Sequence, residues 1–132
     1  MKWIEVIHGS VGSTKIDGLV EAKENEELLL IFEFAGGNVS AFNSKFDNDV
    51  QKVYTNALHV LETRQQLKIF TAAYFDNKII LKVLKKLDYQ FVRYLYVTIN
   101  CPTNTFELRK FVTDINKVLA WARDLGESAR AA

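Results

Sequence analysis

The strongest constraint on the fold is a run of eight residues, LLLIFEFA, from Leu28 to Ala35, in which Glu33 is the only charged side chain. A membrane-spanning helix needs about 20 apolar residues, so this run is too short to be one. Its nearly continuous apolar character is instead typical of a strand that is covered on both faces. The run therefore predicts an α/β fold, with other layers packed on both sides of a sheet.

Size and composition predict one ordinary globular domain. The chain has 132 residues, and we expect a single domain over residues 1–126 with a frayed tail over residues 127–132. The formal net charge is only +1, so any nucleic-acid binding would depend on a local basic patch. The single Cys101 and the absence of a long apolar segment favour an intracellular protein, cytoplasmic or nuclear, with no membrane contact. A homodimer and a larger parent protein both stay open.

Hydrophobic periodicity predicts six strands and two helices. Segment 78–86 fits a strand or a short helix equally well, and we choose a strand because Asp76-Asn77 is a typical two-residue hairpin turn. Asn48 or Asp49 is expected to cap the first helix, and Gly126 to end the second. The predicted order is β-β-β-α-β-β-β-α, which gives a mixed sheet with helices packed on it. The strands are 2–9, 15–22, 26–35, 66–75, 78–86 and 90–101, and the helices are 50–61 and 105–126.

A second carboxylate, Asp17, lies on the strand that precedes the apolar run. If the connecting loop is 24–26, Asp17 stands directly opposite Glu33 on one face of the hairpin. Two bare carboxylates there repel each other, and a divalent cation such as Mg²⁺ would compensate. A two-residue loop would instead place the acids on opposite faces. In the other interpretation, Asp17 lies at a strand end and Glu33 points to water.

The segment KIDGLV, followed by an apolar strand that ends in LIFEF, resembles the PD-(D/E)XK nuclease superfamily, which has the restriction-endonuclease-like fold. That pattern places an Asp on one hairpin strand and a Glu-x-Lys at the end of the next, before a helix and further strands. The resemblance covers Lys15 to about Phe75. The segments DNDVQKVYTNAL, IFTAAYFDNK and YLYVTINCPT also resemble nuclease-like domains of Crinkler-type effectors. The resemblance implies that Asp17 and Glu33 are ligands of Mg²⁺.

The chain departs from this pattern at one position, because the family lysine would fall at Ala35. In some members the lysine has moved to the following helix, where Lys52 is the candidate here. The predicted catalytic residues are therefore Asp17, Glu33 and Lys52. Nucleic-acid contacts are predicted at Lys15, Gln51, Lys82 and Lys85.

These features predict a Mg²⁺-dependent phosphodiesterase, a nuclease that acts on DNA. Because Ala35 replaces the family lysine, a second hypothesis is a catalytically inactive module of the same fold that binds nucleic acid or protein. A third is a small partner protein of the immunity or antitoxin type, for which the size of the chain is the only argument.

Overall fold

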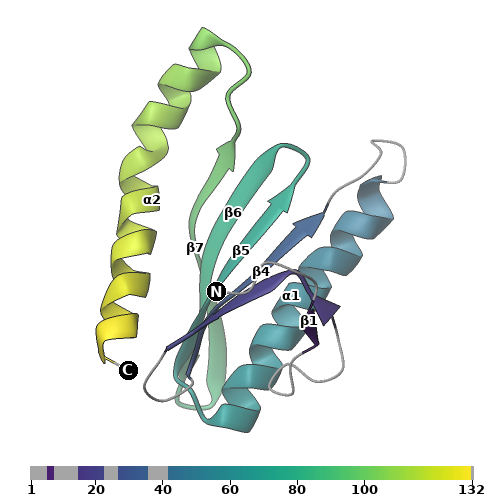
Figure 1. Ribbon diagram of the computed structural model, residues 1–132, viewed down its shortest axis with the longest axis vertical. Helices are drawn as coiled ribbons and strands as arrows, with labels where there is room; N and C mark the ends of the chain where they lie inside the picture. The colour runs from purple at the N-terminus through teal and green to yellow at the C-terminus, as the bar shows by residue number, and fades with distance from the viewer. Residues whose placement is uncertain (1–5, 8–14, 23–26, 36–41, 132) are drawn as a thin grey trace.

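The computed structural model describes residues 6–7, 15–22, 27–35 and 42–131 of the chain. At its centre is a five-stranded sheet in the order β3-β4-β5-β6-β7, and a pair of two-residue strands, β1 and β2, forms a second sheet. Helices α1 and α2 cover opposite faces of the five-stranded sheet (Figure 1). The bounds are β1 Val6–Ile7, β2 Lys15–Ile16, β3 Gly18–Glu21, β4 Leu28–Ala35, α1 Phe42–Arg64, β5 Lys68–Phe75, β6 Lys78–Leu87, β7 Gln90–Asn100 and α2 Thr105–Ala131.

The sheet is mixed, because β4 and β5 pair in parallel whereas all of its other neighbouring strands pair antiparallel. Two parallel strands need a crossover connection, and α1 supplies it. The predicted mixed α/β sheet with two helices packed on it is thus confirmed. Strand β4 is the predicted apolar run, and it lies between β3 and β5 with its side chains from Leu28 to Glu33 buried.

The predicted order of elements is not reproduced in full. Residues 15–22 were expected to form one strand, but the chain bends at Asp17, so that β2 and β3 belong to different sheets. The side chain of Asp17 bonds a backbone group of β4, as described below, and such local bonding competes with a regular ladder. Of the predicted strand 2–9, the described part is β1, and the rest lies outside the described residues.

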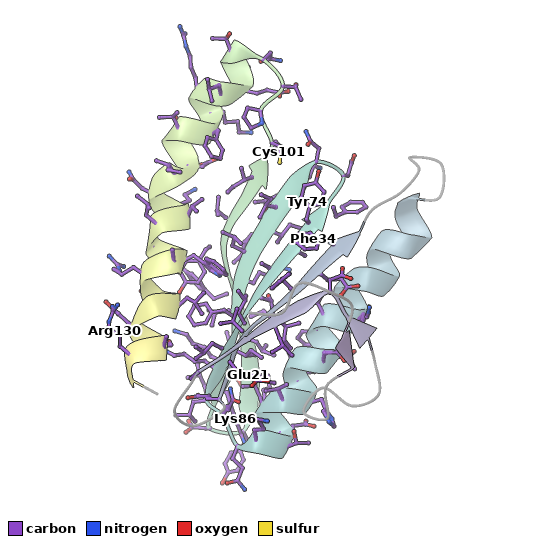
Figure 2. The ribbon with its side chains drawn as sticks, in the orientation of Figure 1. Glu21, Phe34, Tyr74, Lys86, Cys101 and Arg130 are labelled. Carbon is purple, nitrogen blue, oxygen red and sulfur yellow. The ribbon has the colours of Figure 1, made fainter. Side chains whose placement is uncertain are left out.

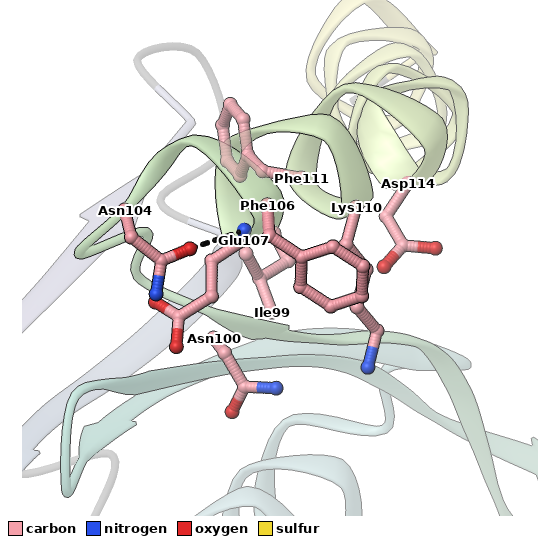
Figure 3. A pocket seen from close by; sticks show the side chains of 8 residues that line it. All are labelled: Ile99, Asn100, Asn104, Phe106, Glu107, Lys110, Phe111 and Asp114. Atoms are coloured by element: carbon pink, nitrogen blue, oxygen red, sulfur yellow. Dashed lines mark hydrogen bonds between the residues drawn. The ribbon is translucent and has the colours of Figure 1, made fainter.

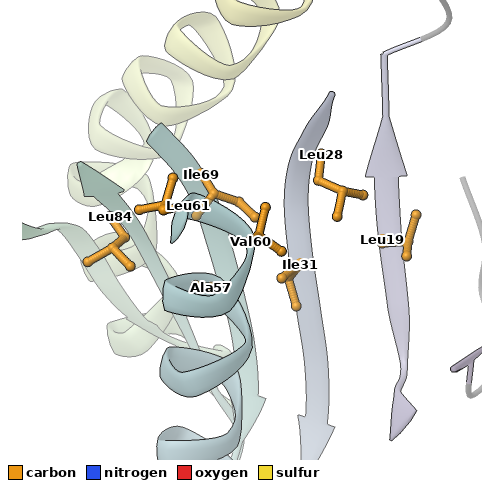
Figure 4. Close-up of a cluster of buried hydrophobic side chains, with 8 residues drawn as sticks. All are labelled: Leu19, Leu28, Ile31, Ala57, Val60, Leu61, Ile69 and Leu84. Atoms are coloured by element: carbon orange, nitrogen blue, oxygen red, sulfur yellow. The ribbon is translucent and has the colours of Figure 1, made fainter. Parts of the chain in front are cut away.

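Each face of the sheet carries its own apolar core. On the α1 face, Ile31 and Ile69 of the sheet pack with Ala57, Val60 and Leu61 of the helix (Figure 4). On the opposite face, α2 contributes Trp121 and Leu125 to the core. These pack with Leu30, Phe32, Phe70 and Val83 of the sheet. Alternate residues of β4 therefore serve different layers, which is why the strand reads as a continuous apolar run.

Helix α1 begins at Phe42, earlier than predicted, so Asn48 and Asp49 lie inside the helix and do not cap it. Both residue types favour caps over helix interiors, which explains the wrong prediction. Intrinsic propensities are small, however, and each residue that extends an existing helix adds one hydrogen bond.

Helix α2 continues past Gly126 to Ala131, so the predicted helix end at Gly126 and the frayed tail over 127–131 are wrong. Packing on both sides of the glycine accounts for the difference. Leu125 packs against the sheet core. Ser128 is buried, and its hydroxyl donates to the carbonyl of Asp124 at 3.0 Å.

The hairpin between β5 and β6 is confirmed, and with it the choice of a strand for the ambiguous segment. Asp76 and Asn77 have φ angles of 47° and 59°, the left-handed values that a type I′ turn requires at both central positions. The side-chain amide of Asn77 also donates to the backbone carbonyl of Cys101 at 3.1 Å. This bond joins the turn to the end of β7.

Polar contacts fix α2 on the sheet beside an irregularity in the β6–β7 ladder. The pairing register shifts between Leu81 and Lys82, so that Tyr96 has no partner of its own in β6, as in a β-bulge. The Tyr96 hydroxyl donates to Asp124 of α2 at 2.7 Å, and the indole of Trp121 donates to the Lys82 carbonyl at 3.2 Å. The hydrogen bond from Tyr96 lowers the pKa of Asp124.

We predict that Gly126→Ala stabilises the protein, because glycine inside a helix costs about 0.5–1 kcal/mol relative to alanine. A Cβ at this position would meet the end of the flexible Arg130 side chain at 3.7 Å, an ordinary contact. Urea unfolding followed by circular dichroism should show a rise of this size in the free energy of unfolding. The reverse change, Ala122→Gly at an exposed position of α2, should lower it by a similar amount. No gain at Gly126 would mean that the helix ends there in solution.

Candidate functional site

The site begins with the pairing register of β3 and β4. Gly18 pairs with Phe32, and Leu19 pairs with Ile31, which is the register predicted for a hairpin that brings Asp17 to Glu33. Nearer the hairpin tip the pairing differs from the predicted one, because Glu21 pairs with Leu28 and the N–H of Ala22 donates to the carbonyl of Glu27. A register shift between Val20 and Glu21 separates these pairs from the pairs that align Asp17 with Glu33. The predicted loop, residues 24–26, lies outside the described residues.

Asp17 and Glu33 each accept a hydrogen bond from the other's segment. The backbone N–H of Asp17 donates to Glu33 Oε2 at 3.2 Å, and the N–H of Phe34 donates to Asp17 Oδ2 at 2.5 Å. These two bonds continue the hairpin through side chains at the point where the regular ladder stops. The structure therefore brings the two acids together, as the register prediction required.

Lys52 completes the group from the neighbouring helix. Its amine Nζ lies 2.7 Å from Glu33 Oε1, which forms a salt bridge and hydrogen bond between α1 and the sheet. Glu33 is only 6% exposed, whereas Lys52 is half-buried. A buried carboxylate needs a compensating charge and hydrogen bonds, and Lys52 with the Asp17 backbone supplies them. We call Asp17, Glu33 and Lys52 the acid–lysine cluster.

Competing effects act on the pKa of Glu33. Burial raises it most strongly, the hydrogen bond from Lys52 lowers it, and the nearby carboxylate of Asp17 raises it further. The net result is a pKa above the ordinary value of 4.5. The structure thus holds an acid that gives up its proton less readily than a surface glutamate, beside a lysine that favours the ionised form.

The cluster offers two carboxylates as hard oxygen donors. Within the described residues, no group of three or more His, Cys, Asp or Glu side chains is arranged to hold a metal ion. Mg²⁺ commonly binds through only one or two carboxylates and keeps several waters, so the donor set of Asp17 and Glu33 fits it. Each carboxylate oxygen has two lone pairs, and the hydrogen bonds described above therefore leave acceptor capacity.

Sequence reasoning missed Asn56, which was assigned to the polar face of the first helix. It is 3% exposed, and its buried amide nitrogen Nδ2 has no hydrogen-bond partner among the residues that the structure describes. Asn56 lies one turn after Lys52, so the two share a face of α1. Their four-residue spacing was the available signal. An unsatisfied buried donor costs about 1–3 kcal/mol.

The predicted nucleic-acid contacts are not brought into one patch. Gln51 is exposed on α1 beside Lys52 in sequence, and the side chain of Lys15 lies outside the described part of the structure. Lys82 and Lys85 are three residues apart on β6, so they point to opposite faces of the sheet. Lys82 lies on the α1 face together with Leu84, whereas Lys85 lies on the α2 face together with Val83.

A cavity of about 270 Å³ lies elsewhere, between the end of β7 and the first turns of α2 (Figure 3). Phe106, Phe111 and Lys110 line it. The lining acid Glu107 already accepts hydrogen bonds from the backbone and hydroxyl of Thr103, both at 2.7 Å, so its carboxylate serves to cap the helix. The second lining acid, Asp114, forms an ion pair with Lys117 at 3.8 Å.

Comparisons with protein-family models, curated proteins and solved structures found no match to this chain. Among the residues that the structure describes, neither helix is both long enough and apolar enough to cross a membrane.

We predict that Glu33→Gln changes how stability depends on pH. The folded protein binds this proton more tightly than the unfolded chain does, so the wild type loses stability as pH rises above 4.5, the ordinary pKa. Glutamine does not titrate. The free energy of unfolding of the variant, minus that of the wild type, should therefore increase from pH 4.5 toward neutral in urea titrations. Glu62→Gln, at an exposed site on α1, controls for the loss of one negative charge. A difference that shrinks with pH would mean that the Lys52 ion pair outweighs burial.

Proposed function

We propose that the chain is a divalent-metal-dependent phosphodiesterase that cleaves DNA, with Mg²⁺ as the cation and a restriction-endonuclease-like fold. The observation that carries this proposal is the acid–lysine cluster, in which the Lys52 amine lies 2.7 Å from Glu33 while the Asp17 backbone bonds the same carboxylate. Two acids and a lysine are the groups that metal-assisted phosphodiester hydrolysis uses.

Asp17 and Glu33 would hold the cation through their carboxylates. When bound there, Mg²⁺ would supply an activated water and neutralise charge that develops on the phosphate. Lys52 keeps Glu33 ionised and oriented through the salt bridge. Its ammonium group has three donors, so those not used by Glu33 are available for a phosphate oxygen. In this role Lys52 takes the place of a lysine at position 35.

A basic surface on the same face of the sheet supports a polyanionic substrate. Helix α1 packs mainly on β4 and β5, which leaves the α1 face of β6 and β7 more open. Cross-strand pairs lead from Glu33 through Ala73 and Ile80 to Thr98. The charged residues of β6 and β7 on this face are all basic, namely Lys78, Lys82, Lys86 and Arg93.

Lys82 is partly withdrawn from water, whereas Arg93 is exposed and contacts α1. Burial, together with the nearby charge of Arg93, lowers the pKa of Lys82. The guanidinium of Arg93 lies 4.5 Å from the centre of the Tyr54 ring on α1, a cation–π geometry. A phosphate placed between Lys82 and Arg93 would relieve their mutual repulsion. This arrangement favours contact with the nucleic-acid backbone and not with base edges.

We predict that Asp17→Asn, Glu33→Gln and Lys52→Met each reduce Mg²⁺-dependent cleavage of DNA by about a hundredfold or more, the usual cost of removing a group that stabilises developing charge. Cleavage of supercoiled plasmid on gels measures the activity. Calorimetric titration with Mg²⁺ should show weaker binding by the two acid variants, and Glu62→Gln should match the wild type in both assays. Full activity in an Asp17→Asn, Glu33→Gln double variant would contradict the proposal.

The second candidate function is an inactive module of the same fold that binds nucleic acid. One observation favours it, because the hydrogen bonds and ion pair of the cluster already satisfy Glu33 within the protein. A cluster of this kind can serve to join α1 to the β3–β4 hairpin without any chemistry. This candidate requires DNA binding but no cleavage with Mg²⁺ or Mn²⁺.

Both candidates predict that Lys82→Glu weakens DNA binding more than Lys85→Glu does, although the two changes reverse the same charge. Only Lys82 lies on the face that carries Glu33. Filter binding or fluorescence anisotropy, repeated at several salt concentrations, should show a lower affinity and a smaller salt dependence for Lys82→Glu. Equal effects of the two variants would show that the α1 face is not the DNA-binding surface.

A further inference from the structure

Helix α2 has a second apolar stripe that does not pack on the sheet. Its sheet-facing residues include Phe111, Val118 and Trp121. Val112 and Leu119, each one position after a sheet-facing residue, are 59% and 58% exposed, and Leu108, one position after the cavity-lining Glu107, is 48% exposed. With the half-buried Ile115 they follow a 4-3-4 spacing, which places them on one line of the helix surface. We call these four residues the α2 stripe.

The direction of the α2 stripe follows from the contacts of the helix. Asp124 comes one position before the sheet-packed Leu125, and it accepts the hydrogen bond from Tyr96 of β7. The side of α2 that carries Asp124, and with it the positions that each precede a buried residue by one, therefore faces β7. Successive residues of a helix are rotated by about 100°. Positions that follow the buried residues by one therefore lie on the other side of α2, so the α2 stripe faces β5 and β4.

That side of the sheet also exposes aromatic surface. Phe34 is 50% exposed at the end of β4, and its ring makes an edge-to-face contact with Tyr74 of β5 at 6.3 Å between centroids. Phe34 shares a face with Phe32, which packs in the α2-side core. Figure 2 labels Phe34 and Tyr74 at the same end of the sheet. Together with the α2 stripe they give this face of the protein an extended apolar character.

We propose that the α2 stripe is the docking site for an acidic amphipathic helix of another protein. The 4-3-4 spacing of the stripe is the pattern with which one helix receives the apolar seam of another. Several large apolar side chains exposed in one line are typical of a protein–protein interaction site. This proposal is independent of the acid–lysine cluster, which lies on the opposite face of the sheet.

The charges that border the stripe indicate an acidic partner. The next line around α2, two positions after the sheet-facing residues, carries Arg109, Arg123 and Arg130 against a single acid, Glu127. The Arg123 Nε atom lies 3.5 Å from Asp124 Oδ1, whereas Arg109 forms no ion pair with the residues that the structure describes. Acidic residues beside the partner's apolar seam would complement this border.

The same border disfavours a second copy of the chain as the occupant. In a two-fold symmetric pair each copy presents the same surface. The arginine lines of two α2 helices would then border one seam, and like charges at such positions destabilise a helix pair. A partner with Glu or Asp at those positions has no such repulsion.

The test uses a fluorescent helical peptide of about 14 residues, roughly 21 Å long, with Leu at the 4-3-4 positions and Glu on its flanks. A second peptide carries Lys in place of every Glu. Fluorescence anisotropy with the full chain should show that the Glu peptide binds at least about tenfold more tightly than the Lys peptide. Val112→Asn with Leu119→Asn, at exposed sites, should abolish binding. Arg109→Glu with Arg123→Glu should remove the preference for the Glu peptide.

Lys117→Glu, a charge reversal on the other flank of α2, is the matched control and should leave binding unchanged. Amide chemical shifts in NMR spectra should confirm that the variants are folded, and the Glu peptide should perturb residues around Val112 and Leu119. Equal affinity for the two peptides would overturn the proposal. So would a wild-type dimer that the Val112 and Leu119 changes convert to monomers, because the stripe would then be a self-interface.

Discussion

A carboxylate buried on a strand that is covered on both faces must find its counter-charge inside the protein. Glu33 is that carboxylate, and the Lys52 amine at 2.7 Å is its counter-charge. The contact joins the β3–β4 hairpin to α1, the helix that connects the parallel strands β4 and β5. One ion pair therefore links the local hairpin to the crossover that defines the sheet. It also holds the acid near Asp17, whose backbone N–H donates to the same carboxylate.

The sequence predicted the parts that rest on strong local patterns. The apolar run of β4 required layers on both faces, and the Asp76-Asn77 turn settled the ambiguous strand. The approach of Asp17 to Glu33 was predicted from a three-residue loop, 24–26, which lies outside the described residues. The pair Glu21 and Leu28 is out of the predicted register, and a register shift between Val20 and Glu21 restores that register toward Asp17. No sequence pattern reports such a shift. Correct alignment of the two acids therefore depended partly on an irregularity that tertiary structure supplies.

The errors have a common physical origin, because local preferences were overridden by packing and by helix cooperativity. Asn48 and Asp49 are good caps, yet α1 begins at Phe42. Gly126 is a good helix terminator, yet Leu125 and Ser128 are held on either side of it. Asn56 was assigned to a polar face and is buried. Lys82 and Lys85 were grouped by composition, although alternation along β6 sends them to opposite faces.

The two faces of the sheet thus carry different surfaces: the acid–lysine cluster and basic strands on one, the α2 stripe on the other. The central claim is that Asp17 and Glu33 together bind a divalent cation. The most direct measurement is a carbon-detected NMR titration of the Glu33 side-chain carboxyl, with and without Mg²⁺. Without Mg²⁺ its pKa should lie above 4.5, and with Mg²⁺ it should fall, because a bound cation favours the ionised form. The Asp17→Asn variant should lose most of that fall. A Glu33 pKa that Mg²⁺ leaves unchanged would contradict the claim.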